Sequence, residues 1–229
     1  MKAILMSILM ASALLAQAPA SKTGTSKTGT SKTGTSKAAT SKTGAARPSL
    51  MNPAALKAKA PEDFKAEFAT TKGDFVIEAH RAWSPHGVDR FYSLVRAGYF
   101  DGVAFYRVHP GFMVQFGISP KPAVNKAWDN ANIPDDPVMG SNARGIVTYA
   151  QTAAPNSRST QLFINFKDNS FLDSQRFAPI GQVITGMDIV DMLYSGYGEI
   201  PPMGGKGPDP DKLENEGDAY LVKNFPMID

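Results

Sequence analysis

Residues 105–117 read FYRVHPGFMVQFG, and this stretch decides the fold class and the kind of site to look for. Arg107 stands among aromatic and aliphatic residues typical of a buried β-strand. Burying a guanidinium group is costly unless a partner compensates its charge. Gln115 is a candidate partner on a following strand. Because Pro110-Gly111 interrupts the alternation of side chains, periodicity alone does not align the two residues.

Short β-strand patterns dominate the chain on both sides of this stretch. Residues 64–77 alternate apolar and polar side chains around a turn at Lys72-Gly73-Asp74, which predicts a β-hairpin. Further strands are predicted at 102–108, 112–116, 145–150, 161–166 and 178–183. A helix is predicted after Ser84 as N-cap, ending at Gly98, and a second over 187–194. This pattern favours a closed antiparallel barrel or a sandwich.

The first 18 residues have the layout of a signal peptide. Lys2 supplies a positive charge, residues 3–15 are an apolar run, and Ala16-Gln17-Ala18 fits a signal-peptidase site. The run is too short for a spanning helix. A buried N-terminal helix is the weaker alternative, because the polar repeat that follows leaves it nothing to pack on. We therefore expect an exported, periplasmic or secreted protein with no stable membrane insertion after cleavage.

Residues 19–61 are predicted to form a disordered linker, which places the folded domain at 62–229. Residues 21–44 repeat Ser-Lys-Thr-Gly-Thr with small variations, and 45–61 continue with three prolines. Serine, threonine and glycine bury little apolar surface, and the evenly spaced lysines repel one another. A plain spacer is favoured over attraction to an anionic envelope surface.

Charge and composition exclude several classes of protein. Residues 1–60 hold nine of the 24 Lys and Arg residues and no Asp or Glu, so 61–229 hold 15 basic and 21 acidic residues. Nucleic-acid binding requires clustered cations on the folded surface, so we expect no nucleic-acid partner. The chain has no cysteine, which excludes disulfides and thiol catalysis.

Familiar catalytic and metal-binding motifs are not found along the sequence. There is no GxSxG elbow and no HExxH motif. The histidines, His80, His86 and His109, have no partner at ligand spacing. In the acidic segment 209–218, Glu214 stands where an EF-hand loop requires glycine. We therefore expect no metal and no other cofactor, and a solvated acidic loop at 209–218.

The quoted stretch resembles the signature F-x-R-V-x-P-G-F-M-x-Q-x-G of the cyclophilin family of peptidyl-prolyl isomerases. Further segments match this family in order: SNARGIVTYA at 141–150, NSRSTQLFI at 156–164, FLD at 171–173, FAPIG at 177–181 and GMDIVD at 186–191. The closing segment, with Glu216-Gly-Asp-Ala-Tyr220, is similar to the tail of a bacterial subgroup. The resemblance extends over roughly 64–229, and so many ordered motifs make it specific.

The resemblance implies a closed eight-stranded antiparallel β-barrel with two capping α-helices and a proline-binding groove on its outer wall. It assigns Arg107 as the catalytic residue and Gln115 as the glutamine that orients it. It also implies a set of substrate-binding residues: Phe112, Met113, Ala150, Gln151, Gln161, Phe163, Phe171, Leu172 and Phe177. Without the surrounding motifs, the apolar members of this set would be interpreted as barrel core, and Arg107 as a surface residue of an edge strand.

Five positions depart from the family pattern, one of them Gln151, which takes the place of an asparagine whose backbone holds the substrate. Phe171 stands where the best-known members have a tryptophan that binds cyclosporin, and Phe177 replaces a histidine at the pocket rim. Phe116 and Ala154 stand at common glycine positions, so we expect them to add bulk near the groove.

The sequence thus predicts a monomeric isomerase that acts on X–Pro bonds of proline-containing polypeptides in the envelope space. Twisting the X–Pro bond returns a lone pair to the proline nitrogen, and a fixed arginine donor interacts more strongly with this twisted state than with the planar one. One alternative is a proline-peptide-binding chaperone or scaffold module with little catalysis. Another is a surface adhesin that uses the lysine-rich repeat.

Overall fold

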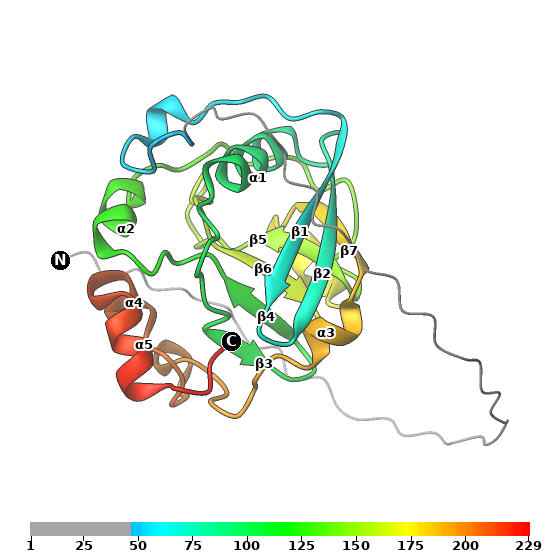
Figure 1. Ribbon diagram of the computed structural model, residues 1–229. Helices are drawn as coiled ribbons and strands as arrows, with labels where there is room; N and C mark the ends of the chain where they lie inside the picture. Colours follow the sequence, from blue (N-terminus) through cyan, green and yellow to red (C-terminus); the bar gives the residue numbers. More distant parts are fainter. Residues whose placement is uncertain (1–46) are drawn as a thin grey trace, which may run out of the picture. The chain divides into compact units, whose positions relative to one another are not determined.

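The computed structural model describes residues 47–229 (Figure 1). The predicted signal peptide and the linker residues 19–46 lie outside the described residues. Residues 47–61, assigned to the linker by composition, pack on the domain in the structure: Leu56 and Ala60 are buried, and Trp128 Nε1 donates to Leu50 O at 2.8 Å. Within 47–229, no helix is both long and apolar enough to span a bilayer.

An antiparallel β-sheet of seven strands forms the centre of the described domain. The strands are β1 (Asp63–Thr70), β2 (Gly73–His80), β3 (Arg107–His109), β4 (Met113–Phe116), β5 (Ile146–Tyr149), β6 (Leu162–Asn165) and β7 (Pro179–Thr185). Their order across the sheet is β1-β2-β7-β5-β6-β4-β3. The predicted hairpin is confirmed, with a tighter turn than expected, because Thr70 pairs with Gly73.

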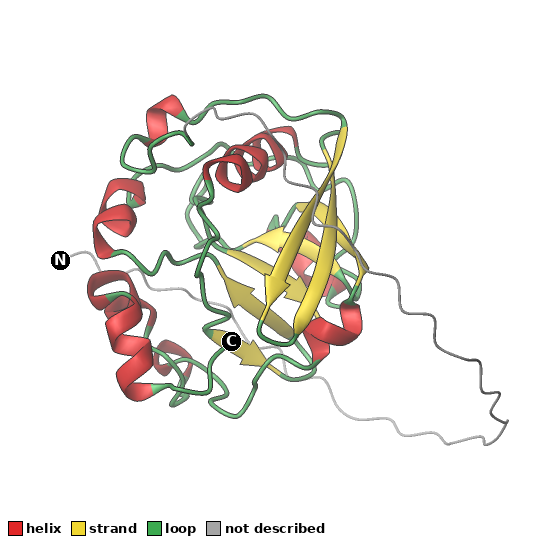
Figure 2. Cartoon of the chain, in the orientation of Figure 1, coloured by secondary structure: helices red, strands yellow, loops and turns green. Residues whose placement is uncertain are grey.

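Helices lie around the periphery of this sheet (Figure 2). They are α1 (Pro85–Ala97), α2 (Pro122–Trp128), α3 (Met187–Asp191), α4 (Pro210–Glu216) and α5 (Asp218–Asn224), with 3-10 turns η1 (Pro53–Ala55), η2 (Ser170–Gln175) and η3 (Pro201–Met203). The two predicted helices correspond to α1 and α3. The acidic loop predicted at 209–218 is wrong, because the Asp209 carboxylate accepts the N–H groups of Asp211 and Lys212 and so begins α4.

The prediction of a closed eight-stranded barrel is also wrong. The sheet described here has seven strands, and β1 and β3 are its two edges. The residues that follow β7 form helices, so no eighth strand joins these edges within 47–229. Asp229 lies between them instead: its carbonyl accepts Phe105 N–H at 2.9 Å and its carboxylate lies 3.1 Å from Lys72 Nζ. A cavity of about 260 Å³ remains beside it, lined partly by Phe68 and Leu221.

The main hydrophobic core lies between the sheet and α1. Phe75 and Ile77 of β2 pack with Val88 and Phe91 of α1, and all four side chains are fully buried. Phe116 belongs to the same core, where its ring contacts Phe68, Phe100 and Phe105. Successive residues of a strand point to opposite faces, so Phe116 and Gln115 face apart. The expectation that Phe116 crowds the groove is therefore wrong.

The N-terminus of α1 is capped by a distant loop. Ser84 occupies the predicted N-cap position, but its hydroxyl donates to Asp136 Oδ2 at 2.6 Å and does not cap the helix itself. The Asp136 carboxylate accepts the N–H groups of His86 at 3.0 Å and Gly87 at 2.9 Å. At the other end, Gly98 adopts the left-handed conformation expected of a helix C-terminus, with φ 70°.

Candidate active site

Arg107 and Gln115 are direct cross-strand partners. In the antiparallel pair β3–β4, Arg107 lies opposite Gln115, which settles the alignment left open by the Pro110-Gly111 turn. Arg107 Nη1 donates to Gln115 Oε1 at 3.1 Å. Both residues are buried, with 2% and 1% of their surface exposed. The strand register therefore brings the predicted catalytic arginine and its glutamine into contact.

Arg107 has a second partner that the sequence reasoning missed. Its Nε donates to Glu199 Oε1 at 2.6 Å, and its Nη2 donates to Glu199 Oε2 at 2.7 Å. Glu199 lies in an irregular segment between α3 and η3, where no periodic pattern marks it. The sequence contained one indication of such a partner. A buried guanidinium requires a compensating charge, but this requirement does not identify which carboxylate supplies it.

The predicted pocket residues form one apolar cluster, distinct from the main core. Met113, Ala150, Phe163, Leu172 and Phe177 are buried together, and Phe112 packs against them. The rings of Phe163 and Phe177 meet edge to face, with centroids 5.8 Å apart. Arg107 Cζ lies 6.0 Å from the ring centroid of Phe112. The guanidinium is thus at the border of the cluster.

The three remaining predicted residues lie around this cluster. Phe171 is 49% exposed and its ring stacks on that of Phe112, with centroids 6.2 Å apart. Gln151 is buried, and its Nε2 donates to Gln175 O at 2.9 Å at the end of η2. Gln161 precedes β6 and joins a polar network behind Gln115.

That network connects the arginine to a titrating carboxylate. Gln161 Oε1 accepts from Gln115 Nε2 at 3.0 Å and from the Tyr106 hydroxyl at 2.7 Å. Gln161 Nε2 donates to Glu214 Oε1 of α4 at 3.3 Å. Burial, with a smaller contribution from nearby Asp211 and Asp129, raises the pKa of Glu214 to about 7. Burial also raises the pKa of Tyr106 far above its ordinary value, so its hydroxyl stays a neutral donor.

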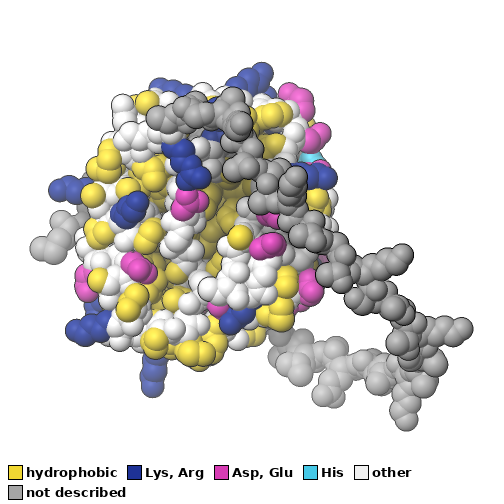
Figure 3. Space-filling model, in the orientation of Figure 1, with side chains coloured by type: hydrophobic (Ala, Val, Ile, Leu, Met, Phe, Trp, Pro, Cys, Tyr) yellow, Lys and Arg dark blue, Asp and Glu magenta, His cyan; other side chains and the backbone are white. Residues whose placement is uncertain are grey.

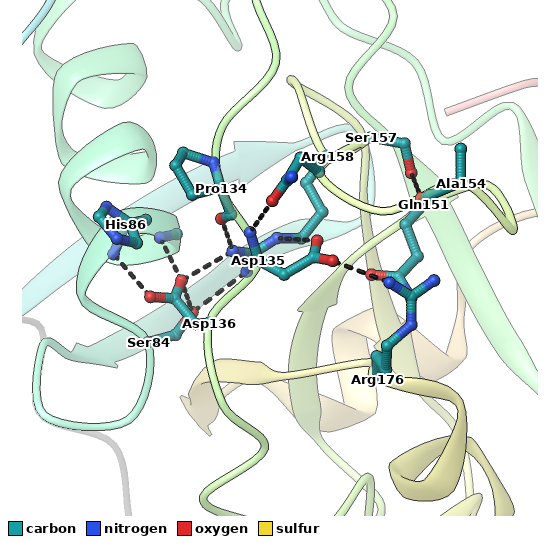
Figure 4. Close-up of polar contacts among 12 residues, drawn as sticks. Ser84, His86, Pro134, Asp135, Asp136, Gln151, Ala154, Ser157, Arg158 and Arg176 are labelled. Carbon is teal, nitrogen blue, oxygen red and sulfur yellow. Dashed lines mark hydrogen bonds and ion pairs between the residues drawn. The ribbon is translucent and has the colours of Figure 1, made fainter.

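A second polar cluster, shown in Figure 4, anchors the loops beside the pocket. Buried Arg158 donates from Nη2 to Asp136 Oδ2 at 2.9 Å, the carboxylate that caps α1. Arg176, which follows η2, donates to Asp135 Oδ2 at 2.9 Å and to Ala153 O at 3.0 Å. Burial opposes the charge on Asp136, but its hydrogen bonds outweigh burial and lower its pKa. The loop with Ala153, η2 and α1 are thereby tied together.

Taken together, these contacts hold a buried cation beside an aromatic-lined apolar surface. Such a surface can bind an apolar ring, while an arginine head group offers donors in a fixed plane next to that ring. Within residues 47–229, no group of three or more His, Asp or Glu side chains is placed to hold a metal ion.

Comparison with known proteins places this arrangement in a family. The model of the cyclophilin type peptidyl-prolyl cis-trans isomerase family matches residues 65–204. A probable peptidyl-prolyl cis-trans isomerase of Brucella abortus is 39% identical over 134 residues, which cover 54% of this chain and 68% of the relative. Peptidyl-prolyl cis-trans isomerase B of Escherichia coli is 33% identical over 134 residues, covering 55% of this chain and 81% of the relative.

A solved structure is similar in fold. The crystal structure of the cyclophilin AquaCyp293 from Hirschia baltica superposes with a TM-score of 0.50 at 20% identity, covering 59% of this chain and 69% of that chain. A further relative, from Acinetobacter baylyi, is 35% identical over 143 residues, covering 60% of this chain and 76% of the relative. The family model spans more than half of the chain and is supported by these relatives, so the chain belongs to the cyclophilin-type family and is a peptidyl-prolyl cis–trans isomerase.

Proposed function

We propose that this isomerase acts on X–Pro bonds of exported or envelope polypeptides, and that Arg107 stabilises the twisted transition state without forming a covalent bond. The export part of the proposal rests on the signal-peptide pattern of residues 1–18 and the linker composition of 19–46. The catalytic part rests on one observation: the Arg107–Gln115 pair stands at the border of an apolar cluster that can hold a proline ring.

The physical task is to lower a rotational barrier of about 18–20 kcal/mol that arises from amide resonance. Resonance withdraws the proline nitrogen lone pair in the planar ground state, and twisting restores it. An N–H donor fixed beside that nitrogen therefore interacts more strongly with the twisted state, and this difference lowers the barrier. The apolar cluster holds the ring while the other side of the bond rotates. No nucleophile is needed for this step.

Arginine suits the role because its charge persists at every physiological pH and its head group is planar. Gln115 limits the orientations open to that plane, since its amide is itself held by Gln161. Exclusion of water by the aromatic side chains strengthens the donor's effect, because the local dielectric is low.

The decisive experiment measures isomerisation of a short Ala-Pro peptide by NMR exchange, with wild type, Arg107→Ala and Arg107→Lys. A matched control is Arg144→Ala, which removes an exposed arginine paired with Asp191. We expect kcat/KM to fall about 10²–10³-fold in both Arg107 variants, and to be unchanged in the control. Full activity in Arg107→Ala would overturn the assignment of Arg107 as the catalytic residue. A wild type that binds the peptide without accelerating its isomerisation would favour the chaperone or scaffold alternative.

Export is tested separately by fractionating cells that express the full chain. We expect the isomerase in the periplasm or the medium, shortened by the signal peptide. A variant with Ala16 and Ala18 replaced by bulky residues should keep the signal attached, because the peptidase requires small side chains there. An uncleaved wild-type chain in the cytoplasm would contradict the export proposal.

A further inference from the structure

Glu199 is a carboxylate with no role in the site expected from the sequence, yet it makes the shortest contacts to Arg107. Its two oxygens accept from Arg107 Nε at 2.6 Å and Nη2 at 2.7 Å. The Glu199 side chain is 13% exposed and that of Arg107 is 2% exposed. A bidentate pair between arginine and a carboxylate fixes the plane and the direction of the guanidinium group.

Counting donors shows which part of Arg107 this pair leaves free. A guanidinium carries five N–H donors. Glu199 takes the one on Nε and one on Nη2, and Gln115 takes one on Nη1. One N–H therefore remains on each of Nη1 and Nη2, and no other residue within 47–229 accepts from them. The Arg107 Cζ lies 6.0 Å from the centroid of the Phe112 ring, so these two donors lie beside the cluster proposed to hold the proline ring.

Glu199 is itself held in place by the segment that carries it. Its Oε1 also accepts the N–H of Ile200 at 2.7 Å, and its carbonyl accepts the N–H of Gly207 at 2.8 Å. Ile200 is fully buried in a cluster with Tyr106 and Leu213. A Cβ added at Gly205 would collide with the carbonyl oxygen of Glu199, so the chain can pass there only with glycine. The segment therefore presents the carboxylate rigidly.

We propose that Glu199 is a positioning residue for the isomerase reaction, and this inference rests on the proposed role of Arg107. Glu199 holds the Nε edge of the guanidinium and compensates its buried charge, so that the two free donors keep a fixed direction. Gln115 makes a single hydrogen bond to the guanidinium, which restricts the orientation of the head group less than the two bonds to Glu199 do. The residue acts through Arg107 and does not touch the substrate.

The test compares Glu199→Gln with Glu216→Gln, a matched control that removes an exposed carboxylate from α4. Both changes are made in the wild type and in Arg107→Ala, and kcat and KM are measured separately by NMR exchange on an Ala-Pro peptide. We expect Glu199→Gln to lower kcat about ten- to a hundredfold with KM within about threefold, and the control to match its parent. In the Arg107→Ala background, Glu199→Gln should cause no further loss.

The possible outcomes separate this inference from the proposed function. Full activity in Arg107→Ala overturns the proposed function itself. An inactive Arg107→Ala together with unchanged or raised kcat in Glu199→Gln overturns only the positioning role, because the carboxylate would then merely neutralise or restrain the arginine. An equal loss from Glu199→Gln in both backgrounds also overturns it, since the effect would not pass through Arg107.

A measurement on the unmodified protein covers the case in which Glu199→Gln does not fold. The Nε–H resonance of Arg107 is identified in the ¹⁵N–¹H spectrum by its loss in Arg107→Lys. We expect it to be protected from exchange, both free and with saturating Ala-Pro peptide, because Glu199 holds it in both states. Loss of that protection on peptide binding would mean that Glu199 releases the arginine, and would overturn the inference.

Discussion

Phe163 and Phe177 pack edge to face within the apolar cluster. We propose that this cluster binds the proline ring of the substrate. Replacing Phe163 by leucine keeps much of the buried volume, so we expect less than about 1.5 kcal/mol of lost stability. The flat surface beside the ring is lost, so KM should rise severalfold while kcat changes less. Separate measurement of kcat and KM, with urea unfolding, checks both statements; an unchanged KM would contradict the assignment of the pocket.

A substitution at Phe171 tests the predicted weak inhibition by cyclosporin. It stands where the best-known cyclophilins have a tryptophan that binds cyclosporin, and it lies half exposed on the Phe112 ring. We expect the wild type to be weakly inhibited by cyclosporin. Phe171→Trp adds an indole N–H donor at that place and should lower the inhibitory concentration. Inhibition of the wild type at near-stoichiometric drug would refute this prediction.

The elements around the site are connected by hydrogen bonds and ion pairs between residues that are far apart in the sequence. The start of α1 depends on Asp136, a residue of the loop between α2 and β5, and Asp136 in turn compensates buried Arg158. Near the open edge formed by β3, the Asp229 carbonyl likewise accepts the N–H of Phe105, a residue just before that strand. Contacts between distant elements therefore contribute stability that is usually supplied by local helix caps and by hydrogen bonds between neighbouring strands.

Asp136→Ala tests this dependence at the scale of the element. It removes the carboxylate that accepts three hydrogen bonds at the start of α1, from the Ser84 hydroxyl and the N–H groups of His86 and Gly87. It also removes the buried carboxylate paired with Arg158. We expect a loss of about 3–5 kcal/mol in the free energy of unfolding. Asp191→Ala, which removes one side of the exposed pair with Arg144, should cost about 0–1 kcal/mol. Equal losses in the two variants, measured by urea unfolding, would argue against the capping role.

At the scale of the whole molecule, the helices α4 and α5 replace the strand that would close the sheet and bring Glu214 behind the site. On the face drawn in Figure 3, charged side chains of both signs are interspersed with apolar ones. Glu214 differs from such exposed groups because burial raises its pKa from 4.5 to about 7. Its titration therefore contributes to the pH dependence of global stability.

The sign of this contribution follows from proton counting. Between pH 4.5 and about 7, the folded chain retains the Glu214 proton that the unfolded chain has lost. The contribution of Glu214 to the free energy of unfolding therefore falls as pH rises through that interval and becomes constant above it. Glu214→Gln should remove the fall, making the variant more stable than wild type at pH 8 by on the order of 1–3 kcal/mol. Urea unfolding at pH 5, 6, 7 and 8 checks this; parallel profiles would contradict it.

Much of the fold was predictable because its signals are local. Alternation identified the β1–β2 hairpin, and the sequence around Ser84 and Gly98 located α1. The ordered motifs also named the residues of the apolar cluster, which the structure brings together. Strand 102–108 was predicted too long, since β3 begins at Arg107, where pairing with β4 starts. The eighth strand was expected from the resemblance alone, and helix-starting residues at the C-terminal end override it.

The sequence by itself therefore determined the family, most strands, α1 and the composition of the apolar cluster, because alternation, caps and motifs act over a few residues. Tertiary structure alone decided that Arg107 lies opposite Gln115, that Glu199 holds the arginine, and that the sheet stays open. Arg107 and Glu199 are 92 residues apart. The physical reason is that a buried charge requires a partner, while chain topology chooses which distant carboxylate supplies it.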